Sequence, residues 1–442
     1  TLFIISNEKT IFKLLKKDYL KMRNTILSVL IITTILCGVL VYFIPQIGTY
    51  ILLSIASLLT IIAIYDSLQR KHSLLRSFPL VARLRWLFEE EREKIQQYFI
   101  EDNLNGTPIN REKRSIVYQR SKLEKETVPF GTQHNVYKKG YEFVKHSLFP
   151  KDHHHIKGDR VVFGSDKCVQ KYENSIINIS AMSFGSLSKN AIMALNQGAK
   201  MANFAHNTGE GGISPYHLQG GDLIFQVGTG YFGAGKSING KRVFDDKIFK
   251  ENAIRPEVKM IEIKLSQGAK PGKGGILPGE KVTAEIAAIR GIKQGDDSIS
   301  PNGHPDIDNV EELLNMIDTV RQTTGKPVGF KAVIGEANWL DQMCSTILAR
   351  GIESAPDFIT IDSADGGTGA APQSLMDYVG LPLTESLPLV TNKLNQYGLR
   401  KRIKIICSGK LITPAGVAWA LCMGTDFVTS ARGFMFSLGC IQ

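Results

Sequence analysis

From about residue 160 onward the chain repeats one pattern: a short apolar, β-branched run, a glycine-rich or polar loop, and then apolar residues spaced three and four apart. Short strands that alternate with helices indicate a parallel sheet. Eight such units in about 280 residues fit a closed (β/α)8 barrel better than an open, doubly wound sheet. The predicted strands are 175–180, 203–207, 223–227, 260–265, 327–334, 357–362, 403–408 and 426–430.

Two uncharged runs precede this pattern, Thr25 to Ile44 and Tyr50 to Tyr65. Either alone could be a buried core helix, but together they predict a transmembrane hairpin, because about 20 apolar residues span the hydrocarbon of a bilayer. A cleaved signal peptide fits poorly, since a second apolar run follows the first. Basic residues flank both outer ends and are missing from the turn, which predicts a multi-pass protein of the cell membrane with both ends, and the barrel, in the cytoplasm.

The patterns divide the chain into four predicted parts: a basic segment (1–24), the transmembrane hairpin (25–66), a mixed cap region (67–158) that begins with a helix near 81–99, and the barrel (159–442). The chain starts at Thr1, and only Ala431 to Gln442 follow the last strand. This tail is short for a complete last helix. We therefore expect the natural chain to extend beyond Gln442.

The charge and the cysteines narrow the class of protein. The net charge is +11 and the pI is about 9.2, but the basic residues are dispersed and no nucleic-acid-binding motif occurs, so an anionic membrane surface is the favoured partner. The six cysteines contain no CxxC pair, which favours a reducing cytoplasm over a disulfide framework or a zinc site. The run His153-His154-His155 is interpreted as a solvated loop rather than a metal site.

Polar side chains follow the predicted strand ends, where (β/α)8 enzymes place their chemistry. Glu210 lies among glycines, and Gln267 and Lys270 lie in 267-QGAKPGKGG-275. A carboxylate, an ammonium group and an amide together suit a keto-acid or dicarboxylate substrate and a proton transfer, although Glu210 could instead cap the next helix.

The loops after strands six, seven and eight indicate a phosphorylated ligand. They contain 362-DSADGGTGAAP-372, 408-SGK-410 and 430-SARG-433, which combine glycine with cations. Lys331 lies inside strand five, where an ammonium group must reach the barrel mouth or an anionic partner; a flavin ring is one such partner. The match to GxGxxG at 228–233 is interpreted as a barrel loop, because an Asn-Gly turn and not a helix follows it.

These motifs carry a resemblance to a known family. The stretch from about 175 to 442 resembles the FMN-binding synthase domain of glutamate synthase through ISAMSFGSLS, HNTGEGG, IKLSQGAKPGKGGILPG, DSADGGTGAAP and SLGC. The front part resembles the membrane-associated bacterial branch, the FMN-binding glutamate synthase family proteins. The resemblance implies an oxidoreductase of amino-acid biosynthesis and ammonia assimilation: FMN reduces 2-iminoglutarate, formed from 2-oxoglutarate and ammonia, to glutamate.

The resemblance also implies roles for single residues. Glu210, Gln267 and Lys270 become the catalytic, substrate-side residues, and Cys440 becomes the first ligand of a 3Fe-4S cluster that the family places after strand eight. The residues implied to line the FMN are Met182, Ser183, Asn207, Gln226, Lys331, Gly366, Gly367, Gly409 and Gly433.

Several features depart from the family pattern. The predicted membrane hairpin stands where the family has a glutaminase domain, and no nicotinamide-binding domain is recognisable. Tyr231 replaces an arginine of the family. This replacement weakens the case for 2-oxoglutarate, because tyrosine cannot bind a carboxylate in the same bidentate way. We therefore expect free ammonia and a separate electron donor such as ferredoxin. Two alternatives stay open: a transferase resembling methylamine-glutamate N-methyltransferase, and a catalytically silent membrane scaffold. The oligomeric state is also open, a homo-oligomer included.

Overall fold

The computed structural model describes residues 2–102, 104–124, 127, 129–152, 160–268, 270–369 and 371–441, with side chains described from residue 22 onward. The chain forms two compact units, Thr1–Gly106 and Thr107–Gln442.

The first unit is helical. Its elements are α1 (Leu2–Phe43), α2 (Ile47–Leu68), α3 (Ser73–Ser77), α4 (Val81–Ile95) and the π-helix η1 (Gln96–Ile100). The basic segment that opens the chain thus continues into the first long helix. The hydroxyls of Thr34 and Thr60 lie 2.8 Å apart, which joins α1 to α2 as a hairpin. Within these helices Met22–Phe43 and Ile47–Leu68 are long and apolar enough to cross a membrane, judged by length and composition alone.

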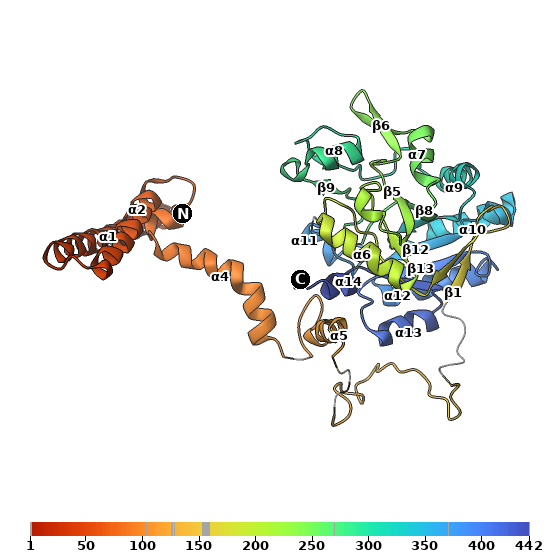
Figure 1. Cartoon of the computed structure of the whole chain (residues 1–442), viewed down its shortest axis with the longest axis horizontal. Coiled ribbons are helices and arrows are strands. Elements are labelled where there is room, and N and C mark those ends of the chain that lie inside the picture. The colour runs from red at the N-terminus through yellow and green to blue at the C-terminus, as the bar shows by residue number, and fades with distance from the viewer. Residues whose placement is uncertain are drawn as a thin grey trace. The chain divides into compact units, whose positions relative to one another are not determined.

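The second unit contains a closed barrel of eight parallel strands, so the predicted fold class is confirmed (Figure 1). The barrel closes where the first strand pairs with the last, Ile177 opposite Val428. Each strand falls within or next to a predicted run: β3 (Ile177–Ile179), β4 (Ala205–Asn207), β5 (Asp222–Val227), β8 (Val258–Lys264), β11 (Val328–Ala332), β12 (Phe358–Asp362), β13 (Lys404–Ser408) and β14 (Phe427–Ser430).

Helices follow the strands and cover the barrel. In α9, the Asn309 side chain accepts the backbone N–H of Glu312 at the start, and Gly325 ends the helix with φ 66°, as helix caps require. The helices of this unit are α5 (Arg111–Ser121), α6 (Lys189–Ala202), α7 (Asp246–Ala253), α8 (Ala284–Arg290), α9 (Val310–Thr324), α10 (Asn338–Arg350), α11 (Gln373–Met376), α12 (Leu383–Gln396), α13 (Pro414–Cys422), α14 (Arg432–Ser437) and the 3-10 turns η3 (Pro215–His217), η4 (Gly279–Lys281) and η5 (Ile352–Ser354).

A hairpin of β1 (Arg160–Phe163) and β2 (Tyr172–Ser175) closes the barrel at the amino ends of its strands. The fully buried ring of Phe163 lies 6.1 Å from that of Phe358 and 5.1 Å from that of Phe427, edge to face. Both partners begin barrel strands. The barrel interior is therefore apolar at this end, and its chemistry is confined to the opposite end.

Two short antiparallel strand pairs follow barrel strands. β6 (Gly235–Ile238) and β7 (Lys241–Phe244) form a hairpin after β5, and β9 (Ile276–Leu277) pairs with β10 (Ser298–Ile299) after β8, with η4 and α8 in the connection between them. Asn239 and Gly240, both at positive φ (51° and 77°), make the tight turn between β6 and β7. The segment 228–233 therefore leads into a hairpin and not into a helix, and its interpretation as a barrel loop is confirmed.

The inward face of the barrel becomes polar along each strand. On β8, Met260 belongs to the apolar base, while Glu262 and Lys264 follow at alternate positions towards the carboxyl end. Alternate residues of a strand point to the same side. Their neighbours Ile261 and Ile263 pack against the outer helices instead. Charged groups are thus brought together at the mouth of the barrel.

Candidate active site

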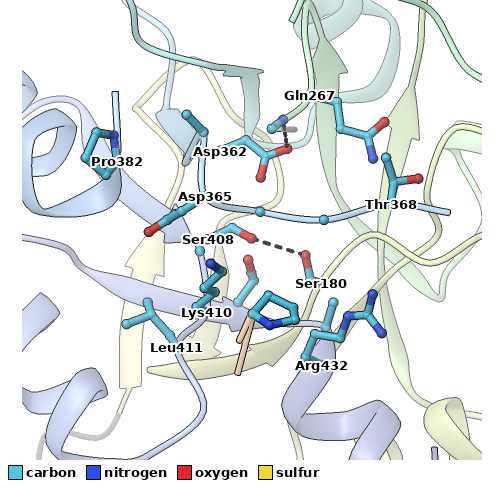
Figure 2. A pocket seen from close by; sticks show the side chains of 18 of the residues that line it. Ser180, Gln267, Asp362, Asp365, Thr368, Pro382, Ser408, Lys410, Leu411 and Arg432 are labelled. Carbon is cyan, nitrogen blue, oxygen red and sulfur yellow. Dashed lines mark hydrogen bonds between the residues drawn. The ribbon is translucent and has the colours of Figure 1, made fainter. Parts of the chain in front are cut away.

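A cavity of about 480 Å³ opens at the carboxyl ends of the strands (Figure 2). Its walls come mainly from the loops after β8, β12, β13 and β14, as expected for a (β/α)8 enzyme. Of the residues predicted at the site, five line it: Gln267, Lys331, Gly366, Gly367 and Gly409.

One side of this cavity is suited to an anion. Lys410 and Arg432 lie across it from Asp362 and Gln267 (Figure 2). Ser180 and Ser408 also line it, with their hydroxyls 3.5 Å apart. A Cβ added at Gly367 would come no closer than 3.8 Å to its nearest neighbour, the Arg432 guanidinium. The Gly367 backbone and the Arg432 guanidinium are therefore close neighbours in the cavity wall.

Lys331 reaches the same cavity from β11. It is 5% exposed, and its Nζ lies 3.3 Å from Oδ2 of Asp362. Burial alone would lower the pKa of Lys331, but the carboxylates of Asp362, Glu262 and Glu210 raise it above its ordinary value. Lys331 is therefore a fixed positive charge at neutral pH.

A buried carboxylate, Glu262, lies at the same level of the barrel. Asn207 Nδ2 and Gln226 Nε2 donate to its Oε1 at 2.8 and 2.7 Å, and the Thr360 hydroxyl donates to its Oε2 at 2.5 Å. Asn207 and Gln226 were predicted to line the flavin. Their amide groups instead donate hydrogen bonds to Glu262, and neither residue lines the large cavity. These bonds supply the partners that a carboxylate 2% exposed needs.

Glu210 is held by a lysine that the sequence analysis did not select. Lys264 Nζ lies 3.1 Å from Glu210 Oε2 and donates to Gln267 Oε1 at 2.9 Å. Burial alone would raise the pKa of Glu210, but Lys264, followed by Lys270 and Lys331, lowers it below its ordinary value. Glu210 is therefore ionised at neutral pH. Its chain is pressed against Gly228, where an added Cβ would lie 2.6 Å from the Glu210 Cβ.

Lys270 completes this cluster without lining the large cavity. It is 3% exposed, and burial together with the charge of Lys264 lowers its pKa. The space directly beside Glu210 measures about 10 Å³, and Gln267 lines both this space and the large cavity. Room of that size holds about one water molecule. The two spaces are therefore neighbours that share one amide side chain.

Tyr231, the position that departs from the family pattern, has its hydrogen-bond partners outside this cluster. The residue is fully buried, and its hydroxyl hydrogen-bonds to Asp306 and lies 3.0 Å from His304 Nδ1. A guanidinium is nevertheless near. The guanidinium carbon of Arg290 lies 5.3 Å from the centroid of the Phe232 ring. Burial lowers the pKa of Arg290, and the negative charge of Glu210 opposes that shift. Its Nε has no hydrogen-bond partner in the described part of the chain.

The other residues predicted to line the flavin are Met182, Ser183 and Gly433. The backbone carbonyl of Met182 lies 3.2 Å from His217 Nε2, and the Ser183 hydroxyl lies 3.0 Å from that of Ser186. Gly433 packs on Ser430, whose Oγ would be 2.7 Å from an added Cβ. Met182, Ser183 and Gly433 are not among the described residues that line the large cavity.

The predicted iron–sulfur ligand stands alone. Cys440 is partly exposed, and its carbonyl accepts a hydrogen bond from the Tyr118 hydroxyl at 2.8 Å. Among the described residues no group of three His, Cys, Asp or Glu side chains could hold a metal. The other cysteine ligands of the 3Fe-4S cluster are expected beyond Gln442, so the cluster stays a prediction. The run 153–155 lies outside the described residues.

Lys264, Glu262 and Asp362 are the main site residues that the sequence analysis missed. The pattern did contain their signal. In 260-MIEIKL-265 the charged residues Glu262 and Lys264 alternate with isoleucines. In 358-FITID-362 the polar residues Thr360 and Asp362 also alternate with isoleucines. A strict period of two in a barrel strand places all four polar side chains inside.

Comparison with known proteins gives one consistent result. The family model described as "Conserved region in glutamate synthase" matches residues 120–442. The glutamate synthase large subunit-like protein YerD of Bacillus subtilis is 37% identical over 422 residues, covering 86% of this chain and 79% of that protein. The archaeal glutamate synthase (NADPH) of Methanocaldococcus jannaschii is 39% identical over 269 residues, which are 60% of this chain and 48% of that protein. The chain thus matches about half the length of the archaeal relative.

Proposed function

Because the chain belongs to the glutamate synthase family and is a glutamate-synthase-like oxidoreductase, we propose that its barrel binds FMN and reduces an imino acid, formed from a 2-keto acid and ammonia, to an amino acid. One observation carries the proposal. The large cavity with its cations shares Gln267 with the cluster of Glu210, Lys264 and Lys270. A cofactor site and a charged substrate site are thus adjacent.

The residues of the cavity fit FMN. A volume of about 480 Å³ is in the range of cofactor pockets, which runs from roughly 300 to 1,000 Å³. Lys410, Arg432 and the loops that bear them would hold the phosphate, Gly366 and Gly367 would allow the ring system to approach the backbone, and Lys331 would place its charge beside it. When bound, the flavin supplies hydride transfer.

The substrate site would be formed by the cluster beside the cavity. Lys270 would bind a substrate carboxylate, and the ionised Glu210 would accept a proton during imine formation, with Lys264 as its neighbour. 2-Oxoglutarate is the first candidate because the chain belongs to the glutamate synthase family.

We assign the electrons and the ammonia to sources outside the barrel. Residues 160–441, as far as described, form one barrel with its covering helices. A separate protein such as ferredoxin would deliver electrons, and free ammonia would supply nitrogen. The proposed division of the chain remains a basic segment (1–24), a membrane hairpin (25–66), a cap region (67–158) and the FMN domain (159–442).

The direct test uses the full-length protein, purified in detergent. We expect a flavin absorbance spectrum and a steady, ammonia-dependent consumption of reduced ferredoxin with a keto acid, tested over a panel that begins with 2-oxoglutarate. A flavin-loaded protein that exchanges an amine with glutamate, without consuming reductant, would instead identify a transferase. A preparation that binds no FMN when the cofactor is added would contradict the proposal.

A second prediction concerns the membrane. We propose that Met22–Phe43 and Ile47–Leu68 cross it, with the barrel in the cytoplasm, since both helices present apolar side chains along most of their length. The protein should stay with the membrane fraction in high salt and at alkaline pH and dissolve only in detergent. Release of the protein from the membrane by salt alone would contradict the transmembrane hairpin. It would instead indicate attachment by electrostatic attraction between the basic protein and anionic lipids.

A further inference from the structure

The wall of the large cavity includes residues that no motif or comparison assigns to it. Pro108 and Ile109 line the cavity, and Ile109 is 4% exposed. Both precede residue 120, where the match to the family model begins. They belong to the segment Thr107–Ser121, which opens the second unit of the chain and is called the strap below.

The strap has its own internal support for Ile109. The guanidinium of Arg114, 3% exposed, donates to the Ile109 carbonyl at 3.2 Å. The next residue, Asn110, caps α5 by accepting the backbone N–H of Lys113 at 3.1 Å. An N-cap and a buried charge-assisted bond together fix the backbone on both sides of the isoleucine. Ile109 is therefore presented to the cavity by a defined structure.

The strap is also fastened to the barrel. The Tyr118 hydroxyl donates to the Cys440 carbonyl at 2.8 Å, and its ring lies 5.9 Å from that of Phe436. Phe436 is on α14, the helix that starts at Arg432 in the cavity wall. The strap thus packs on the element that carries one of the cations proposed to bind the phosphate.

We propose that Pro108 and Ile109 are part of the flavin-binding site and retain bound FMN by closing its cavity on the side of β14 and α14. This inference rests on the proposed function. Two apolar side chains in that wall keep water from the ligand, which strengthens the attraction between its phosphate and the nearby Arg432 and Lys410. Release of FMN would require the strap to move away from α14.

The test compares the rate of flavin release from the parent protein and from its variants, each full-length and in detergent. The released flavin is separated by timed ultrafiltration and measured by its absorbance in the filtrate. Ile109→Ala should speed release about tenfold, because the shorter side chain covers less of the ligand's apolar surface. The matched control is Gln119→Ala, an exposed position on the same helix α5, which should release flavin at the parental rate. Should Ile109→Ala fail to fold, Ile109→Val removes one carbon and should still give a smaller acceleration.

Tyr118 acts only through the strap, as a positioning residue. Tyr118→Phe removes the bond to the Cys440 carbonyl and should speed release about threefold, with no further acceleration when combined with Ile109→Ala, because both act on one element. A flavin-loaded parent whose Ile109 variants release flavin at the parental rate would overturn the role of the strap and leave the proposed function standing. A parent that binds no flavin would overturn both.

Discussion

Glu210→Gln is expected to lower turnover by about 100-fold to 10,000-fold, the range over which a positioned acid or base contributes to rate. Glutamine keeps the size of the side chain but cannot take up a proton. Because Glu210 lies beside the flavin cavity and not in its wall, the variant should retain its flavin. Steady-state kinetics with each accepted keto acid, together with the flavin-to-protein ratio, measures both effects.

The matched comparison is Lys270→Met. Loss of one partner of a desolvated charge pair costs about 2 to 5 kcal/mol, so the Michaelis constant for the keto acid should rise by about 30-fold or more while turnover changes less. If both variants match the parent on every substrate, the assignment of this cluster is wrong even though flavin binding survives.

The pH profile gives a further check on Glu210. Its pKa lies below the ordinary value, so the carboxylate loses its charge only when the pH falls through that lowered value. Activity that depends on the ionised form should therefore show no acidic limb from this group between about pH 5 and 8, because an unperturbed glutamate already titrates near 4.3. An acidic limb near neutrality that Glu210→Gln removes would contradict the ion pair with Lys264.

Lys331→Met is expected to lower the reduction potential of the bound flavin by about 30 mV or more. For a two-electron couple, 30 mV corresponds to about 1.4 kcal/mol, and one buried unit charge a few ångströms away supplies at least this much. Lys331 is the positive partner of Asp362 and stays protonated. Its removal therefore disfavours any negative charge that the flavin gains on reduction. Redox titration of the visible spectrum measures the shift.

Lys331→Arg is the control, since it keeps the charge and should move the potential less. The methionine variant also leaves Asp362 without the ammonium group 3.3 Å away, so its thermal midpoint is measured beside the potential. An unchanged potential in a folded, flavin-loaded Lys331→Met protein would remove Lys331 from the flavin site.

The barrel was predictable because each strand is a compact apolar run followed by a glycine-rich loop, and those local patterns need no knowledge of distant partners. The partners of the site residues were harder to predict. Asn207 and Gln226 follow strand patterns in the sequence, but their shared acceptor, Glu262, lies on another strand. Lys264 and Lys331 are opposite each other only because β8 pairs with β11 in that register.

The contribution of the strap to the cavity wall could not be predicted from local sequence patterns, for a different reason. Residues 101–115 have the composition of an irregular connection, and nothing in them indicates that Ile109 ends in the wall of a cavity. That position depends on Tyr118 meeting the Cys440 carbonyl, a contact between residues more than three hundred positions apart. Contacts of this kind exist only after the barrel has closed.

The pairing of β3 with β14 has a consequence for how the protein is made. Val428 on the last barrel strand pairs with Ile177 on the first, so the barrel cannot close until all eight strands have left the ribosome. At about 5 to 20 residues per second, roughly 10 to 50 s separate the synthesis of these two strands. The hairpin of α1 and α2 is complete well before that. With this hairpin inserted in the membrane, as proposed above, a nascent chain would be tethered at its front end while the edges of its incomplete sheet are still unpaired, and exposed sheet edges favour aggregation.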